Sequence, residues 1–86
     1  MAGELNDRIE VIAAFGHLGM EPRLFVWKRR RYPISRVAWV WTEPEGLFRQ
    51  HHFTVLTRGA TDLYEICFHP RDLVWHLLRI CSKPLR

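Results

Sequence analysis

The sequence has little cysteine and contains none of the short motifs that specify a reaction. Cys67 and Cys81 are its only cysteines, which is too few for a disulfide scaffold, and neither belongs to a Cys-x-x-Cys pair. No nucleophile elbow, P-loop or His-Glu-x-x-His motif occurs. Both thiols lie in apolar segments, where a buried and unreactive thiol is the common case. The sequence therefore predicts a protein that is not an enzyme.

Long hydrophobic runs are also missing. No apolar run exceeds five residues, as in Val37–Trp41, whereas a membrane-spanning helix needs about 20. The first residues, Met1–Asp7, are polar and acidic, and they lack the basic and apolar regions of a signal peptide. We therefore expect a cytoplasmic protein with reduced thiols that does not associate with a membrane.

The length of the chain limits it to one domain. A chain of 86 residues buries a smaller share of its surface than a larger protein does, so its core is thin. Four Trp, five Phe and two Tyr compensate, because each brings a large apolar surface to the core or to an interface. We expect a single domain over residues 1–86, with flexible ends at 1–6 and 82–86.

Turn signals recur at short spacing along the chain, and segments rich in β-branched and aromatic residues lie between them. The signals are Gly16 and Gly19, Glu21-Pro22, Glu43-Pro44-Glu45-Gly46, Arg58-Gly59, and His69-Pro70-Arg71-Asp72. This pattern is typical of a small barrel or sandwich. The predicted fold is mainly β: an antiparallel barrel or strongly bent sheet of about six strands, with a short helix at a terminus as the alternative.

That alternative concerns two segments. As a strand, Arg8–Phe15 has apolar residues on both faces, whereas as a helix it would begin at Asp7, with Glu10 completing a capping box. Arg71–Cys81 alternates as the second strand of a closing hairpin, but its apolar residues also fit a helical repeat. Strands are favoured in both segments. In the hairpin, burial favours a register that pairs Phe68 with Leu73 or Trp75.

The strand that follows the arginines changes its alternation pattern midway. Its large apolar residues are Tyr32, Ile34, Val37, Trp39 and Trp41. One added residue near 35–36 would return all five to a single face, which predicts a β-bulge there. Pro33 donates no backbone hydrogen bond, so it belongs at a sheet edge or at this bulge. Trp39 and Trp41 share one face; we expect a core face rather than an exposed stacking platform.

The excess positive charge of the chain is local. The net charge is +4, and residues 28–36 carry five basic side chains and no acidic one, while the remaining residues carry eight basic and nine acidic groups. The five are Lys28, Arg29, Arg30, Arg31 and Arg36. Trp27 and Tyr32 flank the run, which places cations beside flat rings. A local basic patch says more about binding than a diffuse charge does.

This basic hairpin is the best functional candidate in the sequence. Arginines contact phosphates, and aromatic rings stack on unpaired bases, so the combination predicts a nucleic-acid-binding accessory module. The simpler interpretation is a solvated turn, with Trp27 and Tyr32 paired in the core. The alternative function is a protein-interaction or self-association module that pairs through exposed sheet edges, with a protein partner or a second copy of the chain. An enzyme is the least favoured function.

Five histidines raise the question of a metal site. His51 and His52 are adjacent, so in a strand they point to opposite faces and cannot bind one ion together. Zinc needs three or four convergent ligands. A site built from His52, His69, His76 and Cys67 would require all four to converge from distant segments. The sequence therefore predicts no metal and no other cofactor.

The pattern Pro22-x-x-Phe25-x-Trp27-x-x-Arg30-x-Tyr32-x-Ile34-x-x-Val37 resembles that of small bacterial domains of unknown function. The resemblance extends over roughly residues 8 to 80, and Tyr64-Glu65-Ile66 and Trp75-His76-Leu77 resemble the closing hairpin of those domains. It implies a compact β fold and carries over no catalytic residue. Those domains usually have a glycine in the turn after the tryptophan, whereas here the turn consists of Lys and Arg.

Overall fold

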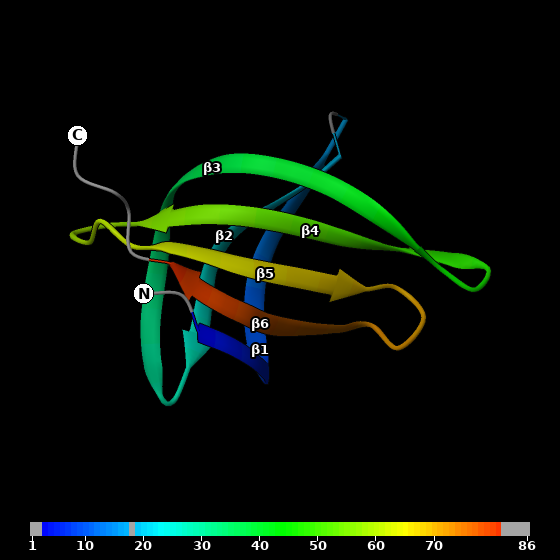
Figure 1. Cartoon of the computed structure of the whole chain (residues 1–86). Coiled ribbons are helices and arrows are strands. Elements are labelled where there is room, and N and C mark those ends of the chain that lie inside the picture. The colour runs from blue at the N-terminus through cyan, green and yellow to red at the C-terminus, as the bar shows by residue number, and fades with distance from the viewer. Residues whose placement is uncertain (1–2, 18, 82–86) are drawn as a thin grey trace.

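The computed structural model describes residues 3–17 and 19–81. They form six antiparallel strands in the order of the sequence, and the last strand pairs with the first to close a barrel (Figure 1). The strands are β1 (Gly3–Gly16), β2 (Gly19–Trp27), β3 (Arg30–Glu45), β4 (Phe48–Thr57), β5 (Leu63–His69) and β6 (Val74–Cys81). The predicted mainly β barrel of six strands is therefore confirmed. The described residues contain no helix long and apolar enough to cross a membrane.

Both ambiguous segments are strands. β1 and β6 pair with each other, with Ile9 opposite Trp75. Phe68 pairs with Trp75, as burial of the aromatic face predicts, and Cys67 lies opposite His76. The segment 3–6, expected to be part of a flexible end, instead lies in β1, because its backbone pairs with β6 through Gly3 and Glu4. Residues 1–2 and 82–86 of the expected ends lie outside the described part of the chain.

The core fills the inside of the barrel. Phe25, Val55, Ile66 and Leu77 are fully buried, and each comes from a different strand. Burying an aliphatic or aromatic side chain of this size contributes roughly 1.5–3 kcal/mol. Aromatic rings extend this core toward the β2–β3 turn, where Tyr32 stacks on Phe25 with ring centroids 4.8 Å apart.

β3 contains two bulges rather than one. The bulge near residues 35–36 is confirmed, since the register with β4 shifts between Ile34 and Arg36. A second shift between Val37 and Trp39 makes Ala38 an additional residue and reverses the faces of everything that follows. The prediction that Trp39 and Trp41 face the core is therefore wrong.

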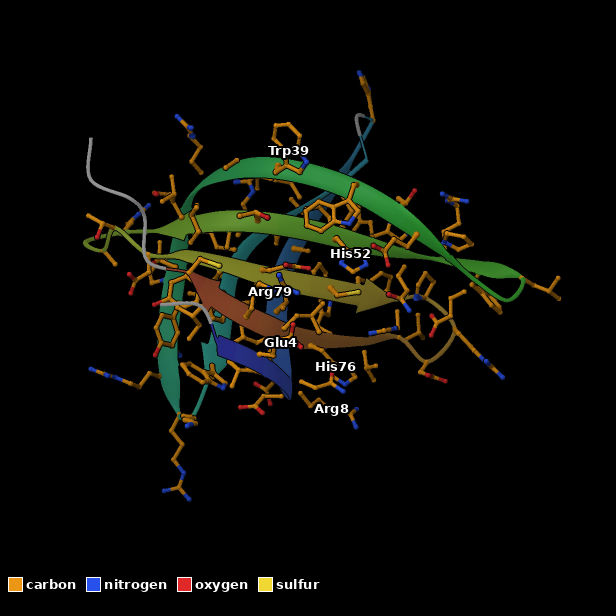
Figure 2. All side chains as sticks on the ribbon, viewed as in Figure 1. Glu4, Arg8, Trp39, His52, His76 and Arg79 are labelled. Atoms are coloured by element: carbon orange, nitrogen blue, oxygen red, sulfur yellow. The ribbon has the colours of Figure 1, made fainter. Side chains whose placement is uncertain are left out.

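Trp39 lies on the outside of the barrel, where 67% of it is exposed, and Figure 2 shows it projecting away from the arch of β3. Trp41 lies on the same outer face and stacks on His52, with ring centroids 4.9 Å apart.

The ring of strands is closed over only part of its length. The ladder between β2 and β3 has four residue pairs and ends where Leu24 pairs with Pro33. Pro33 has no N–H to continue it. Beyond this point β2 pairs only with β1, and β3 only with β4. The two diverge around a pocket of about 640 Å³, lined by Met20, Val37 and Phe53 among others.

The β3–β4 turn also differs from the expected one. Glu43–Gly46 suits a type I turn by composition, but Pro44 and Glu45 continue β3 and pair with Arg49 and Phe48. The loop is only Gly46-Leu47. Gly46 has a φ of 60°, and a positive φ at the first loop residue alone is the geometry of a type II′ turn.

Candidate functional site

The basic hairpin, Trp27–Tyr32, is held in an unusual conformation. Trp27 pairs with Arg30, so Lys28 and Arg29 form a two-residue loop. Their φ angles are 52° and 66°, and positive φ at both positions is the requirement of a type I′ turn. That turn normally takes Asn-Gly or Gly-Gly, because a side chain with a Cβ is disfavoured in the left-handed region.

The aromatic residues of the hairpin are structural. Trp27 donates a hydrogen bond from Nε1 to Oδ2 of Asp7 at 2.8 Å. Tyr32 stacks on Phe25 and also contacts the ring of Tyr64. Both Trp27 and Tyr32 are partly buried and pack against the core, which favours a structural role for their rings over stacking on a base. Lys28 Nζ lies 4.9 Å above the Trp27 ring, which positions this ammonium by a cation–π contact.

The basic side chains do not form one cluster. Arg30 and Arg31 are successive strand residues, so they point to opposite faces of β3; Arg31 pairs with Val26 on the outer face. Arg36 lies six residues beyond Arg30, roughly 20 Å away at the rise of a β-strand. None of the five predicted cations forms an ion pair with another described residue. Only Lys28 and Arg29 line a common depression.

That depression is a concave surface of about 850 Å³ between the β2–β3 turn, β1 and the start of β6. Arg8 of β1 lines it together with Lys28 and Arg29, and Glu10 is the one acidic residue in its lining. Its floor includes Ile9 and Trp75, both buried core residues. Figure 2 shows Arg8 at the outer surface of β1, next to His76. Nothing in the sequence near Arg8 indicated this role, because the barrel closure brings it to the turn.

Backbone strain is concentrated at this same surface. Only Lys28, Arg29 and Leu73 have a positive φ among the described residues that are not glycine, and all three line the concave surface. Leu73 is 76% exposed, and in its left-handed conformation it closes the β5–β6 turn, where its N–H donates to His69 O at 2.8 Å. Residues held in sparsely populated conformations cost of order 1–3 kcal/mol each and cluster at functional sites. The concave surface is therefore the candidate site.

A second group of residues has suggestive chemistry but no access. On the outer face, the Cys67 Sγ lies 3.8 Å from His52 Nε2, and His52 Nδ1 lies 3.4 Å from Glu65 Oε2, without the alignment of a hydrogen bond. The order thiol, imidazole, carboxylate is that of a nucleophile, its base and an orienting group. His52, however, is 4% exposed and Cys67 fully buried, and Trp41 covers the imidazole.

The state of Cys67 agrees with its burial. Removal of the thiol from water, reinforced by the nearby Glu45, Glu65 and Glu43 carboxylates, raises the pKa of Cys67 to about 12. A thiol with this pKa is almost entirely protonated at neutral pH, and the thiolate is the nucleophilic form. Cys67 lines neither the pocket between β2 and β3 nor the concave surface. The geometry therefore gives Cys67 a structural role.

Two of the histidines lie side by side. His69 and His76 have ring centroids 5.0 Å apart, and His69 Nδ1 lies 3.3 Å from Glu45 Oε1. Burial, followed by the neighbouring His69 and Arg8, lowers the pKa of His76. Within residues 3–17 and 19–81, no group of three or more His, Cys, Asp or Glu side chains is placed to hold a metal ion.

No protein-family model, curated protein or solved structure matches this chain. The resemblance to small bacterial domains of unknown function stays a prediction.

Proposed function

We propose that the protein binds the phosphate backbone of nucleic acid at the concave surface, with Arg8, Lys28 and Arg29 as the phosphate-contacting residues. The observation that carries the proposal is the strained conformation of the two turn residues. A type I′ turn built for stability alone would contain asparagine or glycine. Here two long cations occupy those positions, directly beside a depression that a third cation lines.

The orientation of the aromatic rings limits the mode of binding. Trp27 and Tyr32 pack inward, so the surface presents charge without stacking platforms. Contacts to phosphates alone fix a protein on nucleic acid without reading its sequence. We therefore expect binding that is strongly dependent on salt, weakly dependent on sequence, and no tighter for unpaired bases than for a duplex. Leu73 adds an exposed apolar side chain at the rim.

Fluorescence anisotropy with a labelled duplex, measured against salt concentration, tests the proposal. If Arg8, Lys28 and Arg29 each neutralise one phosphate, the slope of log K against log salt is about −2.7. The double variant K28E/R29E should lose most of the affinity and flatten this slope. The control R49E/R58E changes the net charge equally, at two exposed arginines outside the concave surface, and should change affinity much less.

Two results would overturn the proposal. One is the absence of binding at about 50 mM salt, where phosphate contacts are still strong. The other is an equal loss of affinity in K28E/R29E and R49E/R58E, which would show that only the net charge matters. A single-stranded probe of the same length tests the mode of binding, because clearly tighter binding to it would indicate base stacking rather than contacts to phosphates alone.

A further inference from the structure

Among residues 3–17 and 19–81, no strand pairs with one edge of β3. After Pro33, β3 pairs with β4 on one side only, from Ile34 to Glu45. Outside the strand ladders, the backbone hydrogen bond of the described residues that involves β3 runs from Arg58 N to Pro33 O. Arg58 directly follows β4, so this bond lies on the β4 side of β3 and not at this edge. In Figure 1 this part of β3 is the outer arch of the barrel, while the β1–β2 hairpin passes behind it. The free edge is longer than a typical whole strand of five or six residues.

The free edge is poorly protected after Val37, whereas its start, 34–37, faces Glu21, Pro22 and Arg23 of β2 across a shallow pocket. Natural proteins blunt exposed edges with charged residues and prolines. Along the free edge, 34–45, these occur at Arg36 and at 43–45, and the segment between them, 37–42, has neither. Its exposed apolar side chains include Trp39 on the outside and Val40, which is 57% exposed at the mouth of the pocket. Such an edge is a template for another strand.

The alternation of side chains along the edge follows from the pairing with β4. Val37 and Val40 lie opposite the buried Val55 and Phe53, so they face inward. Trp39, Trp41 and Glu43 occupy the alternate positions, which face outward, and Ala38 is the additional residue of the bulge. Arg36 precedes Val37 and therefore also faces outward.

We propose that a second copy of this chain pairs with the free edge, β3 against β3 in antiparallel orientation, about a two-fold axis at Val40. In this register, with Ala38 treated as the bulge residue in both copies, every facing pair shares a face of the sheet. Val40 meets Val40 of the partner subunit on the inner face, and Trp39 meets Trp41 of the partner subunit on the outer face. Arg36 then faces Glu43 of the partner subunit, twice by symmetry.

Charge complementarity selects both this partner and this register. The edge carries its cation at one end and its anion at the other, so antiparallel self-pairing brings opposite charges together. Shifting the strands by two positions one way places Arg36 opposite Trp41 of the partner subunit. Shifting them the other way places Trp39 opposite Glu43 of the partner subunit. A two-fold axis makes the contact self-complementary, which is the usual arrangement of a homodimer.

The dimer would join the two barrels through one continuous sheet, β4–β3–β3–β4. It would cover Trp39 and Val40, two of the large exposed apolar side chains of the molecule. It also assigns a role to Arg36, which lies far from the concave surface. The dimer and the nucleic-acid proposal stand on different residues, so either can fail without the other.

A charge-swap experiment in sedimentation velocity tests the interface. The wild-type protein should form dimers at about 0.1 mM, where a complex with a micromolar Kd is largely assembled. R36E places two glutamates opposite each other at both symmetric contacts, and E43R places two arginines there. Each should raise the dimer Kd about tenfold, because like charges facing each other across a ladder are unfavourable. An equimolar mixture of R36E and E43R should form a heterodimer, since both contacts then pair opposite charges.

The double variant R36E/E43R provides the matched control, because it restores both pairs within a homodimer. Within its own chain, Glu43 accepts a hydrogen bond from Trp41 Nε1 at 3.4 Å and lies 3.6 Å from His52 Nε2. Both E43R and R36E/E43R lose these contacts, so a dimer that forms in the double variant but not in E43R shows that the interface pairs, and not the contacts within the chain, control dimerisation. Near-ultraviolet circular dichroism of the tryptophans shows whether each variant is folded.

Several outcomes would overturn the proposal. A wild-type protein that is monomeric at about 0.1 mM excludes the dimer. Single variants that dimerise as well as the wild type would place any dimer on another face. A mixture of folded R36E and E43R that remains monomeric would exclude this register, leaving the free edge to an extended segment of a different protein.

Discussion

The two tight turns at the ends of β3 both reverse the chain within two residues, but they use different residues to do so. Each is a two-residue loop, closed by the pair Trp27–Arg30 at one end and Glu45–Phe48 at the other. The β3–β4 turn places Gly46 at the position with a positive φ. The β2–β3 turn needs a positive φ at two positions, and it has Lys28 and Arg29 there. Only the first turn follows the residue preference of its geometry.

The two turns are held in place by different parts of the structure. Gly46 adopts its conformation at little steric cost. Lys28 and Arg29 do not, so the strands below them must fix the loop. They do so through the Trp27–Asp7 hydrogen bond and the stack of Tyr32 on Phe25. The surrounding structure thus maintains a local conformation that its own residues disfavour, and the cations it displays are the basis of the proposed function.

The largest expected effect comes from giving the basic turn the residues that its geometry prefers. The variant K28N/R29G should raise the free energy of unfolding by about 1–2 kcal/mol, because the two strained backbone conformations become favourable. The same variant should weaken nucleic-acid binding, since it removes two phosphate contacts. Urea denaturation followed by tryptophan fluorescence gives the free energy of unfolding, and fluorescence anisotropy gives the nucleic-acid affinity. A loss of stability would show that the two cations stabilise the turn.

The opposite change at the other turn should cost stability and leave binding intact. G46A introduces a Cβ where φ is 60°, and no atom lies within 4 Å of the added carbon. The free energy of unfolding should therefore fall by about 1 kcal/mol, from the backbone conformation alone. Urea denaturation measures this change. Nucleic-acid affinity should equal that of the wild type. An unchanged unfolding free energy would mean that this turn relaxes to another geometry.

Leu73 allows the same test on the third strained residue of the concave surface. L73G should raise the unfolding free energy by about 0.5 kcal/mol, because relief of the left-handed conformation exceeds the greater freedom of glycine in the unfolded chain. L73A is the matched control; it removes the exposed side chain but keeps the strain, and it should not gain stability. The salt slope of binding should be unchanged in both, since neither alters a charge. A gain in L73A equal to that in L73G would show that the side chain, rather than φ, is unfavourable.

The smallest expected effect is a pH dependence at the β3–β4 end. A hydrogen bond from His69 lowers the pKa of the Glu45 carboxyl against the opposing effect of burial. The Glu45 carboxylate therefore stays charged in the folded protein at a pH where the same carboxyl group is already protonated in the unfolded chain. Its contribution to stability is present above the unfolded pKa and is lost as the pH falls through the folded pKa.

The variant E45Q isolates this effect. Its unfolding free energy, compared with the wild type between about pH 7 and about pH 3, should be lower at neutral pH, and the difference should shrink on acidification. A difference that is constant with pH would contradict the assignment.

Much of the fold could be predicted because local alternation and turn residues act over a few neighbouring positions. The bulge near Ser35 and the pairing of Phe68 with Trp75 both follow from keeping large apolar side chains on one face. The orientation of Trp39 and Trp41 could not be predicted. It depends on Ala38, whose bulge leaves no trace in the alternation of the residues that follow it.

The candidate site was predicted only in part. The run of cations from Lys28 to Arg31 was visible as a local excess of charge, whereas the separate location of Arg36 depends on how far β3 extends from the turn. Arg8 and Leu73 carry no local signal, because they join the concave surface only through the pairing of β1 with β6.

Local preferences of the residues specify the strands, most of the turns and the place of the excess charge. These depend on the preferences of residues for their immediate backbone conformation and on period-two burial. Three features depend on tertiary structure: the side chains that face outward after Ala38, the distant residues that surround the basic turn, and the free edge of β3. Tertiary structure also decided the strained turn itself, because Lys28 and Arg29 adopt a positive φ only where the strands on both sides impose it.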